Sequence, residues 1–72
     1  MNEQRFLDEV GKRLASARKS KSISQEELSA ISGLDRVAIG YIEQGRRRPT
    51  LTTVYRLARG LDVRLADLFR GF

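Results

Sequence analysis

The chain has 72 residues, enough for one small domain that we expect to span positions 1–72, and it contains no cysteine or histidine. Disulfides, thiolate metal sites and histidine ligands are thereby excluded, so we expect neither a metal ion nor a cofactor. The net charge is +5 and all of the surplus lies after Gln44, which favours a polyanionic partner without requiring one.

The first half of the chain carries two helix signals. Apolar residues recur at helical spacing over positions 3–19, which predicts an amphipathic helix weakened slightly by Gly11. Ser24 then caps a second helix, and Glu27 three residues later completes a capping box. This helix ends before Gly33, because glycine readily takes the left-handed conformation that closes a helix.

A third helix begins almost at once. Asp35 is its expected N-cap, and Gly45 is expected to close it. Because so short a connection forces the second and third helices to cross steeply, positions 24–44 are predicted to form a helix-turn-helix.

Two further helices are predicted, which makes the fold class all-α. Pro49 and Thr50 open the fourth helix, and a short fifth helix follows. The core face of the fourth is expected at Leu51, Val54, Leu57, Ala58 and Leu61. One short helix cannot bury all the apolar residues at the C-terminus, so we expect a homodimer interface there, with packing back onto the core as the alternative. Its residues are Leu65, Phe69 and Phe72.

The third helix has a face suited to reading DNA. At 100° per residue, positions 38, 39 and 42 fall on the core side, while Arg36, Val37, Gly40 and Tyr41 fall on the other. Arg36 lies in the first turn, where it could donate two bonds to a guanine edge in the major groove. Val37 could touch a thymine methyl, and Tyr41 a base edge or a phosphate. The alternative is that Arg36 is an ordinary solvated residue.

Other residues are expected to position the protein. Gln25 opens the second helix, where free backbone N–H groups favour a phosphate, although it could equally be an ordinary polar residue. Arg46, Arg47 and Arg48 follow the third helix, and we expect at least one of them to contact phosphate. Arg18 and Glu43 lie on or beside apolar helix faces, which suggests a buried structural ion pair.

These residues together resemble the Cro/repressor (XRE-type) helix-turn-helix family. The resemblance covers nearly the whole chain and rests on Ser24-Gln25-Glu26-Glu27-Leu28, Ser32-Gly33-Leu34, Ile39, Ile42-Glu43-Gln44-Gly45, Pro49 and Leu51, with Leu57-Ala58, Leu61-Asp62-Val63 and Asp67-Leu68-Phe69 at the end. It implies a five-helix, lambda-repressor-like domain, usually a homodimer that reads a two-fold symmetric double-stranded DNA operator. It also implies an Arg18–Glu43 ion pair, a phosphate contact by Gln25, and base reading by Arg36, Val37 and Tyr41.

Within that family, the chain most resembles the controller proteins of restriction–modification systems. The resemblance rests on Gly-Leu-x-Arg opening the third helix and Glu-x-Gly-x-Arg closing it. It implies binding to the protein's own promoter region and control of the timing of endonuclease expression, with no module for a small-molecule ligand. An activator would also need a surface for RNA polymerase. The chain departs from the controller pattern at positions 35–38 and 40–41, which bears on the operator sequence.

Two other functional classes make different demands on the sequence. An enzyme is not expected, because the chain has no histidine or cysteine and no carboxylate pair at a catalytic spacing. A protein-binding adaptor of the same fold, such as an antitoxin with a toxin as its main partner, is the alternative. The chain has no apolar run as long as a membrane span and no signal peptide, so we expect a cytoplasmic protein without a membrane partner.

Overall fold

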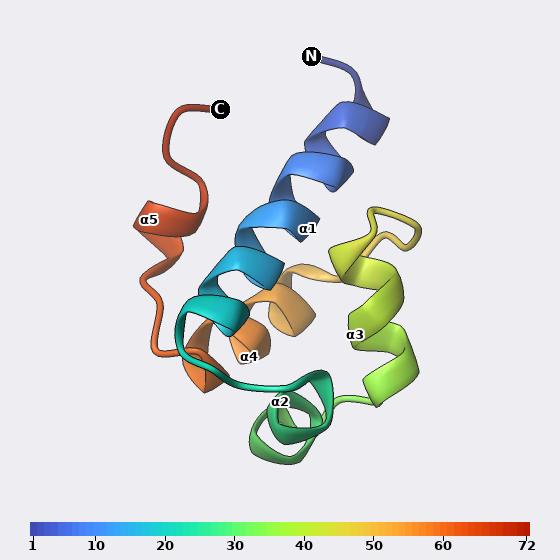
Figure 1. Cartoon of the computed structure of the whole chain (residues 1–72). Coiled ribbons are helices and arrows are strands. Elements are labelled where there is room, and N and C mark those ends of the chain that lie inside the picture. Colours follow the sequence, from blue (N-terminus) through green and yellow to red (C-terminus); the bar gives the residue numbers. More distant parts are fainter.

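Five helices and no strand make up the structure, a computed structural model that describes all 72 residues. The helices are α1 (Glu3–Ser20), α2 (Gln25–Ser32), α3 (Arg36–Glu43), α4 (Leu51–Gly60) and α5 (Leu65–Leu68). The long α1 runs diagonally across the molecule, with α3 on one side of it, α5 on the other and α2 beneath (Figure 1). The prediction of an all-α, five-helix fold is confirmed.

Local capping bonds explain where α2 and α3 begin. The Ser24 hydroxyl accepts the Glu27 N–H, and the Glu27 carboxylate accepts the Ser24 N–H in return, so the predicted capping box is present. The Asp35 carboxylate accepts the Ala38 N–H at 3.0 Å. Gly33 takes a φ of 74° and ends α2, leaving only a tight turn before α3.

The core is made of aliphatic side chains from all five helices. It comprises Val10, Leu14, Leu28, Ile39, Ile42, Val54, Leu57, Leu61 and Leu68. The helices α1 and α3 cross closely at Gly11, where an added Cβ would lie 2.5 Å from the carbonyl oxygens of Ile42 and Glu43. The sequence had indicated only that this glycine weakens α1. In the fold it is the point that lets two backbones meet, which fixes α3 against α1.

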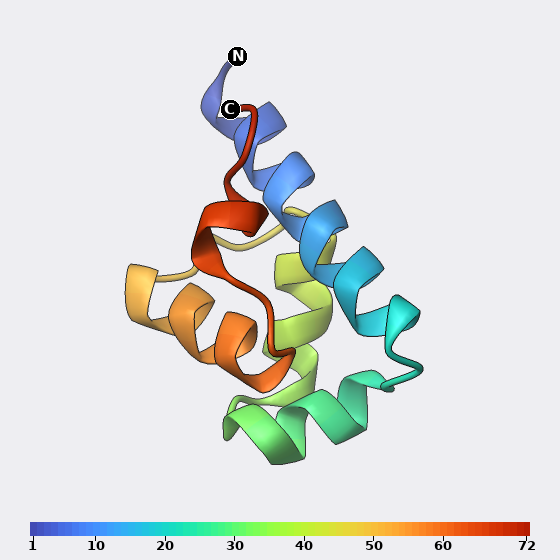
Figure 2. The same ribbon diagram turned by 90° about the vertical axis from the view of Figure 1, so that its left-hand side faces the viewer.

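Leu51 corrects the prediction for α4. The other expected core residues of this helix are buried, but Leu51 is 77% exposed. It is the first residue of α4, whose first turn projects outward from the bundle (Figure 2). Helical periodicity gives the direction of a side chain but cannot tell whether another element covers that turn. Here Leu51 borders an apolar groove of about 270 Å³, lined also by Phe6, Pro49 and Phe69.

The C-terminus folds back over the start of α1, so the two chain ends lie close together (Figures 1 and 2). The rings of Phe6 and Phe72 meet edge to face at 5.0 Å between centroids, and Phe69 packs beside them. Arg13 lies over the Phe72 ring and donates to the carbonyl oxygens of Leu68 and Arg70. No helix combines the length and apolar character needed to cross a membrane.

Candidate nucleic-acid interface

The helix α3 presents one face to the core and the opposite face to solvent. Ile39 and Ile42 are buried against the core, while Arg36, Val37, Tyr41 and Gln44 are exposed. This division follows the predicted one. Arg36 and Val37, in the first turn of α3, are both exposed, so a ligand can reach this turn beside α2.

A shallow hollow separates this face from the start of α2. Gln25 lines it from α2, opposite Arg36, Val37, Gly40 and Tyr41 on α3. An added Cβ at Gly40 would lie 3.6 Å from the Gln25 amide, an ordinary contact distance. The fold therefore does not require a glycine here, although glycine costs about 1 kcal/mol in a helix relative to alanine. Its absent side chain leaves bare backbone on the outward face.

A buried network holds α1, α2 and α3 in fixed relation. The Arg18 guanidinium donates to both carboxylate oxygens of Glu43, at 2.7 and 3.0 Å, and the Gln25 amide donates to the same carboxylate at 3.0 Å. The side chains of Arg18 and Glu43 are only 11% and 7% exposed. Hydrogen bonding to Glu43 raises the pKa of Arg18 above its ordinary value. The network thus links the expected phosphate-contacting residue directly to the last turn of α3.

The arginine run is divided by the way in which α3 ends. Gly45 has a φ of 72°, and the Arg46 N–H bonds back to the Tyr41 carbonyl oxygen at 2.9 Å, the reversal typical of a Schellman motif. The guanidinium carbons of Arg46 and Arg47 lie 5.5 and 5.0 Å from the centre of the Tyr41 ring. Arg48 turns instead to Glu3 on α1, at 3.8 Å. Two of the three arginines therefore flank the α3 face.

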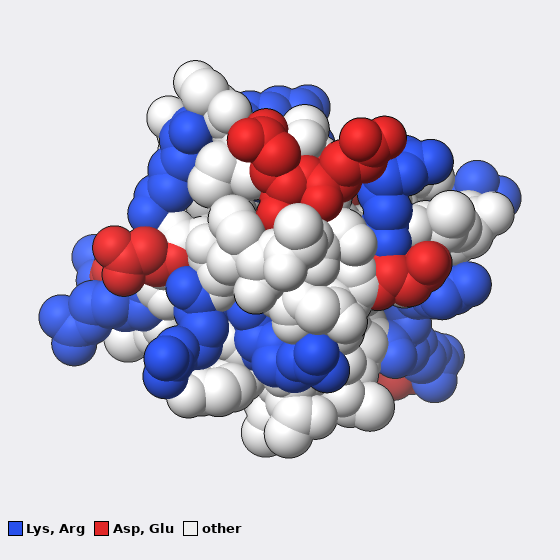
Figure 3. All heavy atoms as spheres, turned by 90° about the horizontal axis from the view of Figure 1, so that it is seen from below, with Lys and Arg blue, Asp and Glu red and all other residues white.

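Positive charge by itself does not mark the interface. Seen from the α2 side, basic side chains surround a largely uncharged centre, and acidic side chains are interspersed among them (Figure 3). The acidic residues at the start of α2 include Glu27. The hydrogen bond that its carboxylate accepts from the Ser24 backbone N–H lowers its pKa most, and hydrogen bonding with the Ser24 hydroxyl lowers it further. The geometry of α3, not the net charge, identifies the face that could enter a groove.

Two contacts between distant parts of the chain were not predicted from the sequence. Arg56 on α4 donates to the Ser32 carbonyl oxygen at 2.9 Å and so satisfies the end of α2. Gln4 on α1 donates to the Gly45 carbonyl oxygen at 2.8 Å and steadies the turn after α3. Each contact joins residues more than twenty positions apart, for which the sequence carries no local signal. The arginine pair over Tyr41 depends in turn on the reversal at Gly45.

Comparisons with known proteins agree with this geometry. A family model described as Helix-turn-helix matches residues 14–68. An uncharacterized HTH-type transcriptional regulator of Sinorhizobium fredii, y4dJ, is 41% identical over 59 residues, which cover 82% of this chain and 77% of that protein.

Solved structures of restriction–modification controller proteins are also similar. C.AhdI of Aeromonas hydrophila superposes with a TM-score of 0.87 at 40% identity, covering 90% of this chain and 98% of that one. The controller protein C.Esp1396I, solved as a tetramer with its natural 35 base-pair operator, superposes with a TM-score of 0.82 at 32% identity. That match covers 88% of this chain and 83% of the other.

Proposed function

The chain belongs to the helix-turn-helix family, whose members similar to it are named as transcriptional regulators, and from this premise we propose that it binds a two-fold symmetric DNA operator as a homodimer. The observation that carries the proposal is the exposed outer face of α3, flanked by Gln25 on one side and by two arginines on the other. Acting on a promoter would place the protein in the cytoplasm with the DNA that it regulates.

Base reading is assigned to the outer face of α3. Arg36 lies in its first exposed turn, where a helix in the major groove meets base edges. Its planar fork of donors matches the O6 and N7 acceptors of guanine. Val37 is 49% exposed one position further on and offers an apolar contact to a thymine methyl. Tyr41 lies on the same face of α3, four positions after Val37.

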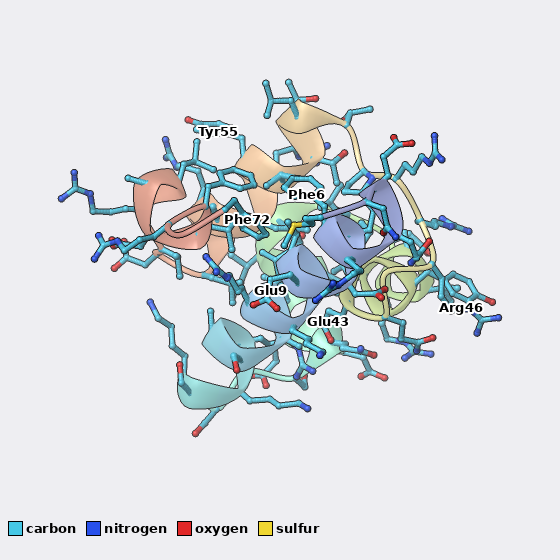
Figure 4. The ribbon with its side chains drawn as sticks, turned by 90° about the horizontal axis from the view of Figure 1, so that it is seen from above. Phe6, Glu9, Glu43, Arg46, Tyr55 and Phe72 are labelled. Carbon is cyan, nitrogen blue, oxygen red and sulfur yellow. The ribbon has the colours of Figure 1, made fainter.

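Phosphate contacts are assigned to the two flanks. Gln25 is the first residue of α2, so its backbone N–H has no partner within the helix, and its side-chain amide keeps one N–H after bonding Glu43. Across the face, Arg46 and Arg47 extend beyond the end of α3, and Figure 4 shows Arg46 at the outer edge of the molecule. Contacts on both sides of a groove would fix how α3 is seated in it.

The homodimer is assigned to the C-terminal apolar surface. Phe69 and Phe72 pack against Phe6 within the chain, yet Phe72 remains 44% exposed. Leu65 on α5 is also exposed, as is Leu51 in the groove that Phe6 and Phe69 line. A two-fold axis through this surface would place two α3 helices about 34 Å apart, facing successive major grooves. Leu65→Glu should then give a monomer by light scattering without loss of helical content. A monomeric wild type at high micromolar concentration contradicts the assignment.

The regulatory role that the relatives favour is that of a restriction–modification controller. C.AhdI and C.Esp1396I carry that description and match most of their own length to this chain. Under this proposal the protein binds DNA upstream of its own gene, beside genes for a methyltransferase or endonuclease. A promoter–reporter fusion with and without the protein decides between activation, which would require contact with RNA polymerase, and repression.

Binding of duplex DNA upstream of the gene tests the proposal directly. Fluorescence anisotropy should show tight binding to a duplex containing the inverted repeat and weaker binding to a scrambled duplex, both falling steeply with salt. Arg36→Ala should reduce the preference for the operator by about 1–3 kcal/mol. Lys12→Ala, which removes an exposed cation on α1, is the matched control and should leave the preference for the operator unchanged. Equal binding of both duplexes by the wild type would refute sequence-specific recognition.

A further inference from the structure

Tyr41 lies between the two parts of the proposed interface. It is on α3, five and six positions before Arg46 and Arg47, and the reversal at Gly45 brings both arginines back beside it. Their guanidinium carbons lie 5.5 and 5.0 Å from the ring centre, within the range of a cation–π interaction. One aromatic ring thus faces two cations at once.

This arrangement leaves the arginines able to donate elsewhere. Attraction to the face of a ring uses the charge of a guanidinium and not its N–H groups, five of which each arginine carries. Arg46 makes a single long bond, 3.5 Å to the Gln44 side chain, and both arginines are exposed. Two guanidinium groups beside the same ring repel each other. The attraction of each group to the electron-rich ring of Tyr41 offsets this repulsion.

The third arginine of the run provides an internal contrast. Arg48 has no aromatic neighbour and approaches Glu3, with both side chains more than three-quarters exposed. Such exposed ion pairs hold a side chain weakly. Only the two arginines that flank α3 are therefore held beside the proposed reading face.

We propose that Tyr41 is a positioning residue, which acts through its ring to hold Arg46 and Arg47 ready for the DNA backbone rather than through its hydroxyl on a base. The proposal rests on the DNA-binding function proposed above and deepens it. Flexible arginines lose side-chain freedom when they bind phosphate, and side chains already held near their bound positions lose less. The ring therefore contributes to affinity for any duplex, while Arg36 contributes to the choice of sequence.

The free protein tests the contact without DNA. Side-chain protons of Arg46 and Arg47 near the face of Tyr41 should show upfield ring-current shifts in NMR spectra. These shifts should persist in Tyr41→Phe, disappear in Tyr41→Leu, and be absent from Arg48 throughout. Arginine shifts at random-coil values in the wild type would overturn the proposal, whether or not the protein binds DNA.

Binding measurements then test the role. Tyr41→Phe keeps the ring and should bind operator and scrambled duplexes as the wild type does, whereas Tyr41→Leu should weaken both by the same factor, roughly five- to tenfold. In an Arg46→Gln, Arg47→Gln background, Tyr41→Leu should cause no further loss, because the ring then has nothing to position. Loss of operator preference in Tyr41→Phe would instead assign the hydroxyl to a base. If Tyr41→Leu weakened DNA binding as much in the Arg46→Gln, Arg47→Gln background as in the wild type, a positioning role would be excluded.

Discussion

Replacing Gly11 with alanine tests the claim that this glycine sets the contact between α1 and α3. In an isolated helix the change is favourable by about 1 kcal/mol. In the folded protein the new Cβ would lie 2.5 Å from the carbonyl oxygens of Ile42 and Glu43, well inside van der Waals contact. Both neighbours are backbone atoms and cannot rotate away, so α1 and α3 must separate. Overpacking typically costs about 1–3 kcal/mol.

We place the Gly11→Ala cost at the upper end of that range because the clash involves backbone on both sides. After the gain in helix propensity, the expected net loss is about 2 kcal/mol. For a domain of this size, that lowers the melting temperature by roughly 8–16 °C. Thermal and urea unfolding, followed by far-ultraviolet circular dichroism, measure the change.

Gly40→Ala is the matched control, since it makes the same substitution in another helix. Its Cβ would meet only the Gln25 amide at 3.6 Å, so the gain of about 1 kcal/mol should remain and raise the melting temperature. A Gly11→Ala protein as stable as the wild type would refute the reasoning, because the helices would then have room to spare. If bare backbone at Gly40 meets DNA, its alanine variant should gain stability and lose operator affinity together.

Three other changes follow from the same contacts. Glu43→Ala should destabilise the fold by about 3–5 kcal/mol, because the Arg18 charge is left buried without its partner, and urea unfolding would register this. Arg47→Ala should weaken binding to all duplexes alike and lower by about 1 the slope of log binding constant against log salt concentration, whereas Arg48→Ala should change that slope less. Anisotropy titrations over a series of salt concentrations compare the two variants. Acidification should remove the contribution of Glu27. Its pKa is lowered from the ordinary 4.5 in the folded state, so this contribution is complete above that value and disappears as pH falls through the folded pKa. Glu27→Gln should reduce the loss in free energy of unfolding on acidification. The same loss in this variant as in the wild type would argue against a contribution from the capping box.

Much of the fold could be predicted because its signals are local. The capping box at Ser24, the Asp35 cap and the left-handed Gly33 each depend on residues within about one helical turn, so the bounds of α2 and α3 follow from the chain alone. The division of α3 into buried and outward faces follows from helical periodicity. The expected Arg18–Glu43 contact is present in the structure, although its bond to Gln25 was not anticipated.

Other features could not be predicted, because they depend on distances between elements far apart in the chain. Leu51 has the spacing of a core residue but projects from a turn that nothing covers. The three arginines are equivalent in sequence, and only the reversal at Gly45 separates the pair beside Tyr41 from Arg48. Periodicity gives the direction of each side chain, but not what lies opposite.

The sequence alone determined the helices, the turn between α2 and α3 and the outward face of α3, since hydrogen bonds and side-chain periodicity within a few residues decide them. The tertiary structure decided the packing role of Gly11 and the contacts of the three consecutive arginines after Gly45. A glycine that weakens α1 in isolation becomes the point where two helix backbones touch. The physical reason is that helix propensity acts within one helix, whereas close packing acts between helices and here outweighs it.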